Sequence, residues 1–174
     1  MRIGLLLVLL LVGTRLCGQS KADSLRRELA RLEQSRPGFA RDTARVRVLC
    51  ELARQTKEWQ AARVYWQHAI DVAEKIEWPA GRLLAYQGMG RHYSRKGSHL
   101  EATYYLHLGL HQAEQLGEAR YRIECYHLLG IAYSQAGDSL NGLRALRTAV
   151  RLARPLSRRL YLTNLNDIGN TYFQ

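Results

Sequence analysis

The strongest constraint on the fold of this chain is a sequence pattern that returns after about forty residues. A large residue, a glycine and a tyrosine three positions later occur at Met89-Gly90 and Tyr93, and the same types recur one period on. The residues that define the repeat are Ala62, Trp66, Ala69, Gly90, Tyr93, Ala102, Gly130, Tyr133, Ala149, Gly169 and Tyr172. A fixed period of this size is typical of arrays in which each unit buries its apolar face against the next. The sequence therefore predicts about three and a half stacked units.

Each unit is expected to consist of two helices. First helices are predicted at about 82–95 and 121–135, and Pro79 suits the first position of a helix because its missing N–H would be unbonded there anyway. Each first helix carries a small residue, Gly90 or Gly130, at the expected crossing with the second helix. Small residues let two helices approach closely while large neighbours fill the gaps beside them.

The turns between the helices carry recognisable end signals. Gly97 is predicted to end one helix, because glycine readily adopts the left-handed backbone that follows a last turn. Ser98 and Glu101 have the spacing of a capping box that would open the next helix. Gly137-Asp138 is expected to end a helix and to open the next one in the same way, one repeat later.

This pattern resembles that of the tetratricopeptide repeat, in which large-x2-Leu-Gly-x2-Tyr precedes Gly and then Ala-x3-large-x2-Ala. The matching residues are Tyr86, Met89, Gly90, Tyr93, Gly97, Ala102, Leu106 and Gly109, followed by Tyr126, Leu129, Gly130, Tyr133, Gly137, Gly142, Leu146 and Ala149. The period is longer than the family's 34 residues, and a closing proline is present only as Pro155. The resemblance covers roughly residues 42–174. It implies an all-α right-handed solenoid of antiparallel helix pairs, with units at 42–80, 81–120 and 121–159 and an incomplete unit at 160–174.

The first eighteen residues have the composition of a signal peptide. Arg2 is followed by an apolar run over residues 3–12, which is shorter than the roughly 20 residues that span a bilayer. Cleavage is expected after Gly18, which would place the chain on the periplasmic side of a Gram-negative envelope. Cys17 leaves lipoprotein processing as an alternative, although the three residues before it do not match Leu-x-small-Cys.

Residues 19–41 are expected to form an entry helix and a linker that cover the open end of the first unit. The helix would begin at a cap formed by Asp23-Ser24 and would end at Pro37-Gly38. Its apolar face carries Leu25, Leu29 and Leu32.

At the other end the pattern stops inside a first helix. Arrays normally close with a polar cap. We therefore expect the natural chain to continue beyond Gln174, as in the exported sensory regions of bacterial signalling proteins that this chain resembles. There the repeats precede a membrane helix and an output domain.

The formal net charge is +11, and removal of Arg2 and Arg15 with the signal segment would leave +9. A charge of this size attracts acidic proteins, lipid head groups and nucleic acid alike. Export argues against nucleic acid, and the basic residues are spread over the helices instead of forming one block. Cys50 and Cys125 lie two repeats apart, too far for a disulfide, and are expected to be small buried residues.

Residues on the first helices are the candidates for binding a partner. The resemblance implies that these helices line a concave wall, on which positions 2, 5, 9 and 12 of each unit share one face. The candidates are Arg47, Glu51, Arg54, Gln87, Arg91, Ser94, Glu124, His127, Ser134, Thr163, Asn166 and Asn170. They suit an acidic or extended peptide, although a solvated helix face without a partner would look similar. Arg47 and Glu51 stand where the carboxylate clamp of chaperone cofactors has lysine and asparagine, so that specific use is not expected.

No catalytic motif is present in the sequence. His107 and His111 are four residues apart on a predicted outer helix, but without further ligands they indicate a solvated pair and no metal site. The aromatic residues Trp59, Tyr65, Trp66, Trp78, Tyr104 and Tyr105 have the spacing of packing residues. The leading prediction is a non-catalytic peptide-binding module without a cofactor and of undetermined oligomeric state. The alternatives are a free or lipid-anchored adaptor that scaffolds an envelope complex, and a cytoplasmic basic array that binds acidic partners or nucleic acid.

Overall fold

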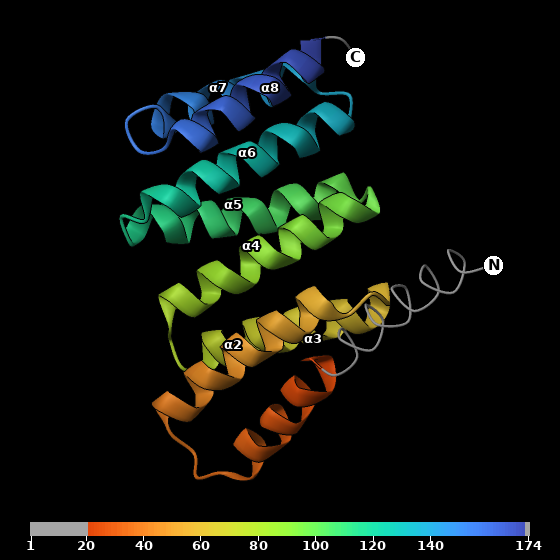
Figure 1. Cartoon of the computed structure of the whole chain (residues 1–174), viewed down its shortest axis with the longest axis vertical. Coiled ribbons are helices and arrows are strands. Elements are labelled where there is room, and N and C mark those ends of the chain that lie inside the picture. Colours follow the sequence, from red (N-terminus) through yellow and green to blue (C-terminus); the bar gives the residue numbers. More distant parts are fainter. Residues whose placement is uncertain (1–20, 173–174) are drawn as a thin grey trace, which may run out of the picture.

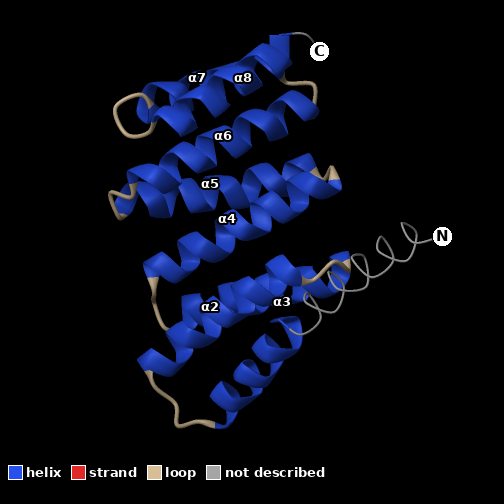
Figure 2. Cartoon of the chain, in the orientation of Figure 1, coloured by secondary structure: helices blue, strands red, loops and turns tan. Residues whose placement is uncertain are grey.

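The computed structural model describes residues 21–172, which are helical throughout apart from short connections (Figures 1 and 2). The predicted signal peptide lies outside these residues. Residues 21–34 are helical, and seven further helices follow in chain order. They are α2 (Phe39–Gln55), α3 (Trp59–Lys75), α4 (Pro79–Lys96), α5 (His99–Gln115), α6 (Ala119–Gln135), α7 (Ser139–Ala153) and α8 (Arg158–Tyr172). The predicted all-α class is confirmed for the part of the chain that is described.

The helices stack in chain order, and each even-numbered helix also lies against the next even-numbered one. Each helix packs against its neighbour in sequence, and α2 contacts α4, α4 contacts α6, and α6 contacts α8. By contrast, the backbones of α3, α5 and α7 do not approach one another closely. The helices α2, α4, α6 and α8 therefore lie closest to one another, and we call the face that they form the inner wall, whereas α3, α5 and α7 stand apart on the opposite face.

Two glycines bring the helices of a pair into contact, as the repeat pattern predicts. A Cβ atom added at Gly90 of α4 would lie 2.6 Å from Leu106 Cγ of α5. One at Gly130 of α6 would lie 2.5 Å from Leu146 Cγ of α7. Both leucines are completely buried. Glycine is needed here because any larger residue would push the two helices apart.

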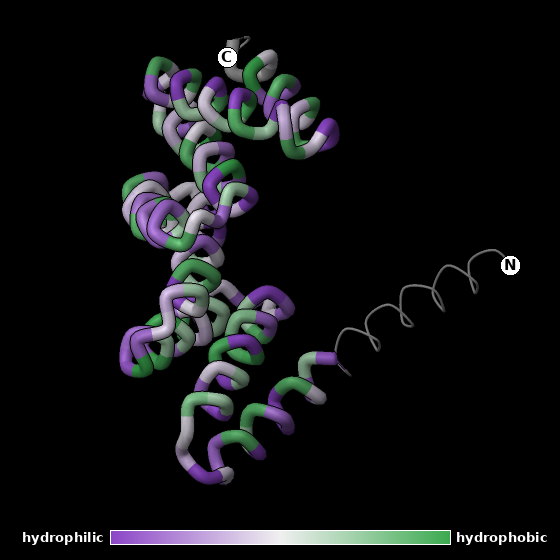
Figure 3. Tube along the Cα trace, turned by 90° about the vertical axis from the view of Figure 1, so that its left-hand side faces the viewer, coloured by the Kyte–Doolittle hydropathy of each residue, from purple (hydrophilic) through white to green (hydrophobic). Residues whose placement is uncertain are grey.

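The core runs along the stack in clusters between successive helices. Trp66 of α3 packs with Leu49 of α2 and Met89 of α4, and a further cluster joins α5, α6 and α7. Hydrophobic and hydrophilic residues alternate along the helices (Figure 3), as expected of elements that bury one side. One aromatic prediction is wrong. Tyr104 is 61% exposed because the outer side of α5 is covered by neither α3 nor α7.

The predicted glycine turns are present. Gly97 follows α4 with φ 80°, and Gly137 follows α6 with φ 84°. Both dihedral angles lie in the left-handed region that glycine tolerates best. Asp138 then accepts a hydrogen bond from the backbone N–H of Asn141, 3.1 Å away, and so caps α7.

The predicted capping box at the start of α5 is not formed. Ser98 precedes α5 but its side chain makes no capping hydrogen bond. Its backbone N–H, which Glu101 would have to reach in a capping box, donates instead to the carbonyl oxygen of Tyr93 at 3.1 Å. The turn that ends α4 has thus already taken the donor that the capping box would use.

The helix at residues 21–34 begins before the predicted cap. Residue 21 is already helical, so Asp23-Ser24 do not start the helix, and Asp23 instead pairs with Arg26 at 2.8 Å. Leu29 packs against the first core cluster, as expected of a helix that covers the first pair. The helical residues end before Pro37, and Gly38 precedes α2, as predicted.

Cys50 and Cys125 are free and buried, which confirms their predicted structural role. Burial raises the pKa of each thiol to about 12. Since the thiolate is the reactive form, we expect both to react with a disulfide reagent at pH 8 roughly a thousandfold more slowly in the folded chain than in urea. The measurement is a thiol titration of a Cys17→Ser chain. Labelling of the folded chain at the rate seen in urea would contradict the packing of α2 and α6.

Candidate binding groove

Two pockets adjoin each other on the inner wall. The first, of about 510 Å³, lies among α2, α3, α4 and α6. The second, of about 730 Å³, lies among α4, α6 and α8. They share Arg91 of α4 and Arg120 and Glu124 of α6. Because of these shared residues we treat the two pockets as one continuous feature and call it the inner groove.

About half of the candidate residues that sequence reasoning selected line this groove. Arg54, Gln87, Arg91 and Glu124 line the first pocket, although they come from three different helices. His127 lines the second pocket together with Arg91 and Glu124. Thr163 of α8 also lines the second pocket. The rule that chose one face of each first helix therefore found residues that the fold brings together.

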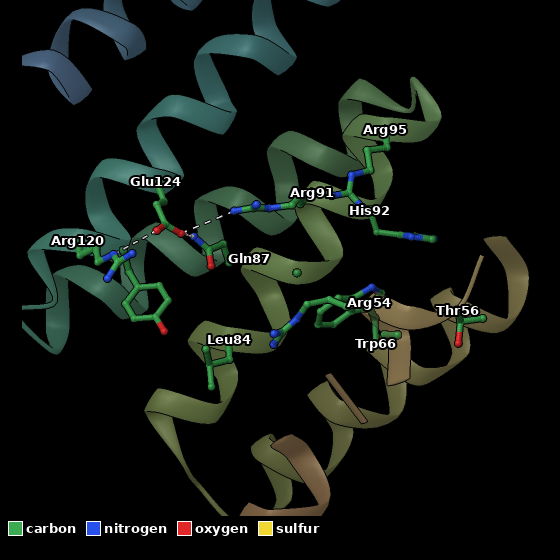
Figure 4. A pocket seen from close by; sticks show the side chains of 13 residues that line it. Arg54, Thr56, Trp66, Leu84, Gln87, Arg91, His92, Arg95, Arg120 and Glu124 are labelled. Carbon is green, nitrogen blue, oxygen red and sulfur yellow. Dashed lines mark hydrogen bonds and ion pairs between the residues drawn. The ribbon is translucent and has the colours of Figure 1, made fainter. Parts of the chain in front are cut away.

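Glu124 lies at the junction of the two pockets and is the only carboxylate among their lining residues. The amide nitrogen of Gln87 donates to Glu124 Oε2 at 2.8 Å. Arg91 Nη2 lies 3.7 Å from the same oxygen, and Arg120 Nε lies 3.6 Å from Oε1. Figure 4 shows these side chains pointing toward one another from α4 and α6. A single carboxylate thus holds three donors together at the middle of the groove.

A second polar contact joins the inner helices farther along the array. His127 Nε2 of α6 lies 2.5 Å from Asp167 Oδ2 of α8. Nearby, the buried Asn164 donates from its amide to the carbonyl oxygen of Leu160 at 2.7 Å. The His127–Asp167 contact links α6 to α8 along the second pocket, whereas the Asn164 hydrogen bond lies within α8.

The lining of the groove has a marked excess of positive charge. Five arginines and one glutamate line it, which leaves a formal excess of four positive charges. The arginines are Arg54, Arg91, Arg95, Arg120 and Arg159. Guanidinium groups stay charged at every physiological pH. His92 adds no charge near neutral pH, because burial lowers its pKa.

The floor of the first pocket is apolar. Trp66 of α3 is 4% exposed and lies against Gly88 of α4, where an added Cβ would come 2.1 Å from the indole ring. Leu84 and Ala53 extend this floor. The glycine thus lets a large ring close the bottom of the pocket while arginines flank the opening (Figure 4). Such an arrangement can accept an apolar group below and an anionic group above.

Two candidates from α2 are engaged elsewhere. The guanidinium of Arg47 lies over the ring of Trp78, 5.5 Å from its centroid. Glu51 pairs with Lys21 of the first helical segment at 2.9 Å, and this contact holds the pKa of its carboxyl group below the ordinary value. Neither residue lines the groove.

The remaining candidates also lie outside the lining. Ser134 donates to the carbonyl oxygen of Gly130 at 2.8 Å and packs at the crossing with α7, next to Gly142. Ser94 and Asn166 line neither pocket. The side chain of Asn170 lies outside the described part of the molecule, and so does that of the repeat residue Tyr172.

Sequence reasoning missed three of the groove's arginines. Arg95 is four residues after Arg91, and Arg120 is four residues before Glu124, so each shares a helical face with a predicted residue. Arg159 lies in the first turn of α8. Extending the chosen face by one turn at each end of the helix would have found Arg95 and Arg120.

The histidine pair on α5 lies away from the groove. His107 Nε2 is 2.9 Å from the hydroxyl of Tyr133, and His111 is 3.1 Å from the amide of Gln115. Both side chains are exposed. Within residues 21–172, no group of three metal-ligating side chains was found.

Comparison with known proteins does not assign a family to this chain. No family model matches it, and no match was found among the curated proteins. Across the helices that the structure describes, none has the length and apolarity needed to cross a membrane. The repeat pattern and the groove are therefore the two features of this chain that indicate its function.

Proposed function

We propose that this chain is a non-catalytic peptide-binding module of the tetratricopeptide kind, whose inner groove holds an extended acidic segment of another protein. The observation that carries the proposal is the excess of guanidinium groups along a groove that crosses the four inner helices α2, α4, α6 and α8. Opposite charge on a ligand gives both faster encounter and selectivity against other ligands.

The alternation of inner and outer helices supports the repeat assignment. In a right-handed solenoid of antiparallel pairs, the first helix of each pair lies on the concave side and contacts the equivalent helix of the next pair. The contacts of α2 with α4, α4 with α6 and α6 with α8 follow this scheme. The groove runs across these helices, so an extended peptide can meet several units at once.

Nucleic acid would be attracted by the same arginines, but the groove offers few accessible aromatic rings on which bases could stack. Proteins that bind single strands without sequence preference stack bases on exposed aromatic rings. Trp66 is 4% exposed and lies beneath the pocket, so it offers no stacking face. Tyr121 and His92 also line the first pocket, but both are half-buried. A groove with so few accessible rings suits carboxylates better than a run of stacked bases.

The compartment in which the module acts is part of the proposal. The composition of residues 1–18 supports export to the periplasmic side of a Gram-negative envelope. There the module would serve as the sensory or scaffolding part of a signalling protein, or as an adaptor in an envelope complex. The mass and cell fraction of the expressed chain test this: a chain that begins at Gln19 supports export, and an uncleaved chain in the cytoplasm contradicts it.

Binding itself is tested with short fluorescein-labelled peptides and the purified chain. The acidic peptide alternates glutamate with leucine, its counterpart has lysine in place of glutamate, and a labelled single-stranded DNA serves as the third probe. We expect micromolar binding of the acidic peptide, weakened about tenfold between low and physiological salt because surface charges are screened. Equal binding of the lysine peptide, or tighter binding of DNA, would contradict the proposal.

A further inference from the structure

The groove already contains a carboxylate that occupies the position suited to an acidic ligand. Glu124 is met by a buried amide from Gln87 and by guanidinium groups from Arg91 and Arg120 (Figure 4). Amide and guanidinium donors converging on two oxygens form the kind of cradle that binds carboxylates. The cradle spans α4 and α6 and lies at the junction of the two pockets.

The two arginines are held loosely in this cradle. Their distances to Glu124, 3.7 Å and 3.6 Å, exceed the roughly 3.2 Å limit of a good N–H···O hydrogen bond. The side chains of Arg91 and Arg120 are 44% and 79% exposed. Their guanidinium N–H groups are therefore available to a closer acceptor. The amide of Gln87, by contrast, is bonded at 2.8 Å and keeps the carboxylate in place.

The other three arginines of the groove form no ion pair with Glu124. Arg54 pairs with Glu51 of its own helix at 3.1 Å, whereas Arg95 and Arg159 form no ion pair with any carboxylate that the structure describes. An acidic segment lying along the groove would thus meet an unpaired arginine in each pocket and a negative charge where the pockets join. Glu124 weakens the attraction where the groove is otherwise best supplied with donors.

We propose that Glu124 acts as an internal competitor, which occupies the carboxylate site formed by Gln87, Arg91 and Arg120 and must yield the two arginines when an acidic ligand binds. This inference rests on the proposed peptide-binding function and deepens it. The ligand supplies a carboxylate to Arg91 and Arg120, and Glu124 keeps only its bond to Gln87. The groove then discriminates against weakly acidic segments, because a ligand must offer more than Glu124 already provides.

The test is the affinity of a Glu124→Gln chain for the peptide that alternates glutamate with leucine. Glutamine has the same shape and still accepts the bond from Gln87, but it carries no charge. We expect binding to tighten by roughly threefold to tenfold, because Arg91 and Arg120 no longer have to be released from Glu124 before they meet the ligand. The control is Glu101→Gln, which makes the same charge change at an exposed position of the outer helix α5 and should leave affinity within about twofold.

A double-mutant cycle keeps the test specific to the cradle. In a chain that carries Arg91→Gln and Arg120→Gln, Glu124 has no guanidinium to release, so Glu124→Gln should change affinity by less than about twofold. Glu124→Ala provides a second removal of the charge should the glutamine variant lose stability in a thermal melt.

The outcomes separate this inference from the function on which it rests. Tighter binding by the Glu124 variants that disappears in the cycle supports the competitor role, and so does binding seen only after Glu124 is replaced. Unchanged or weaker binding by these variants overturns the inference, while binding by the wild-type chain leaves the proposed function intact. Absence of binding by every chain overturns both.

Discussion

Replacing both Arg91 and Arg120 by glutamate is expected to weaken binding of an acidic peptide by at least about a hundredfold. The change removes two of the groove's five arginines and adds two negative charges beside Glu124. Like charges placed opposite a ligand cost several kcal/mol, and 1.4 kcal/mol corresponds to a factor of ten. Fluorescence polarisation of the labelled peptide, with a thermal melt to verify folding, measures the effect.

The matched control places the same charge change on the outer layer. Arg144 and Arg151 of α7 are exposed and lie outside both pockets. Their replacement by glutamate changes the net charge equally, so it tests whether overall charge alone governs affinity. We expect less than about a threefold loss at physiological salt, where charges farther apart than about 8 Å are screened. Similar losses in both double variants would refute a localised groove.

Replacing Gly130 by leucine is expected to destabilise the fold by about 3 kcal/mol. An added Cβ would lie 2.5 Å from Leu146 Cγ and 3.1 Å from the carbonyl oxygen of Gly142, so α6 and α7 would have to separate. Overpacking of a tight contact costs about 1 to 3 kcal/mol, and a whole leucine lies at the upper end of this range. Urea unfolding followed by circular dichroism measures the change.

Gly169 of α8 provides the matched control, since it holds the same place in the repeat. No atom of the described residues lies within 4 Å of a Cβ added there. The same substitution should therefore raise stability by up to about 1 kcal/mol, through the higher helix propensity of leucine. Equal destabilisation at both positions would show that helix geometry in general, and not the crossing with α7, sets the requirement for glycine.

The repeat pattern predicted the helices and their crossings because both depend on features that sequence records directly. A crossing needs a small residue at one position, and Gly90 and Gly130 stand there in each copy. The left-handed turns at Gly97 and Gly137 were visible for the same reason.

Local capping signals were less informative, because hydrogen-bond donors are shared between elements. The capping box at Ser98 was wrong since the end of α4 uses the donor that it requires. The cap at Asp23-Ser24 was wrong since the helix begins before it, a boundary that the two residues alone do not determine.

Only part of the groove was predicted, because the position of a residue on a helix does not determine the direction of its side chain. A helical face determines where a side chain starts, and Arg54, Gln87 and Arg91 reach the groove from the predicted positions. The direction that a side chain takes depends on neighbours far away in sequence. Lys21 engages Glu51, and Trp78 lies beneath Arg47, and neither contact follows from the repeat.

A titration of the isotope-labelled chain with the acidic peptide, followed by amide chemical shifts, shows directly which residues meet the ligand. We expect the largest shift changes along the inner wall, around Arg54 of α2, Arg91 of α4 and Glu124 of α6. Smaller changes are expected near Arg159 of α8. Changes confined to α3, α5 and α7, or no changes at peptide concentrations in the millimolar range, would contradict the assignment of the inner groove as a peptide-binding site.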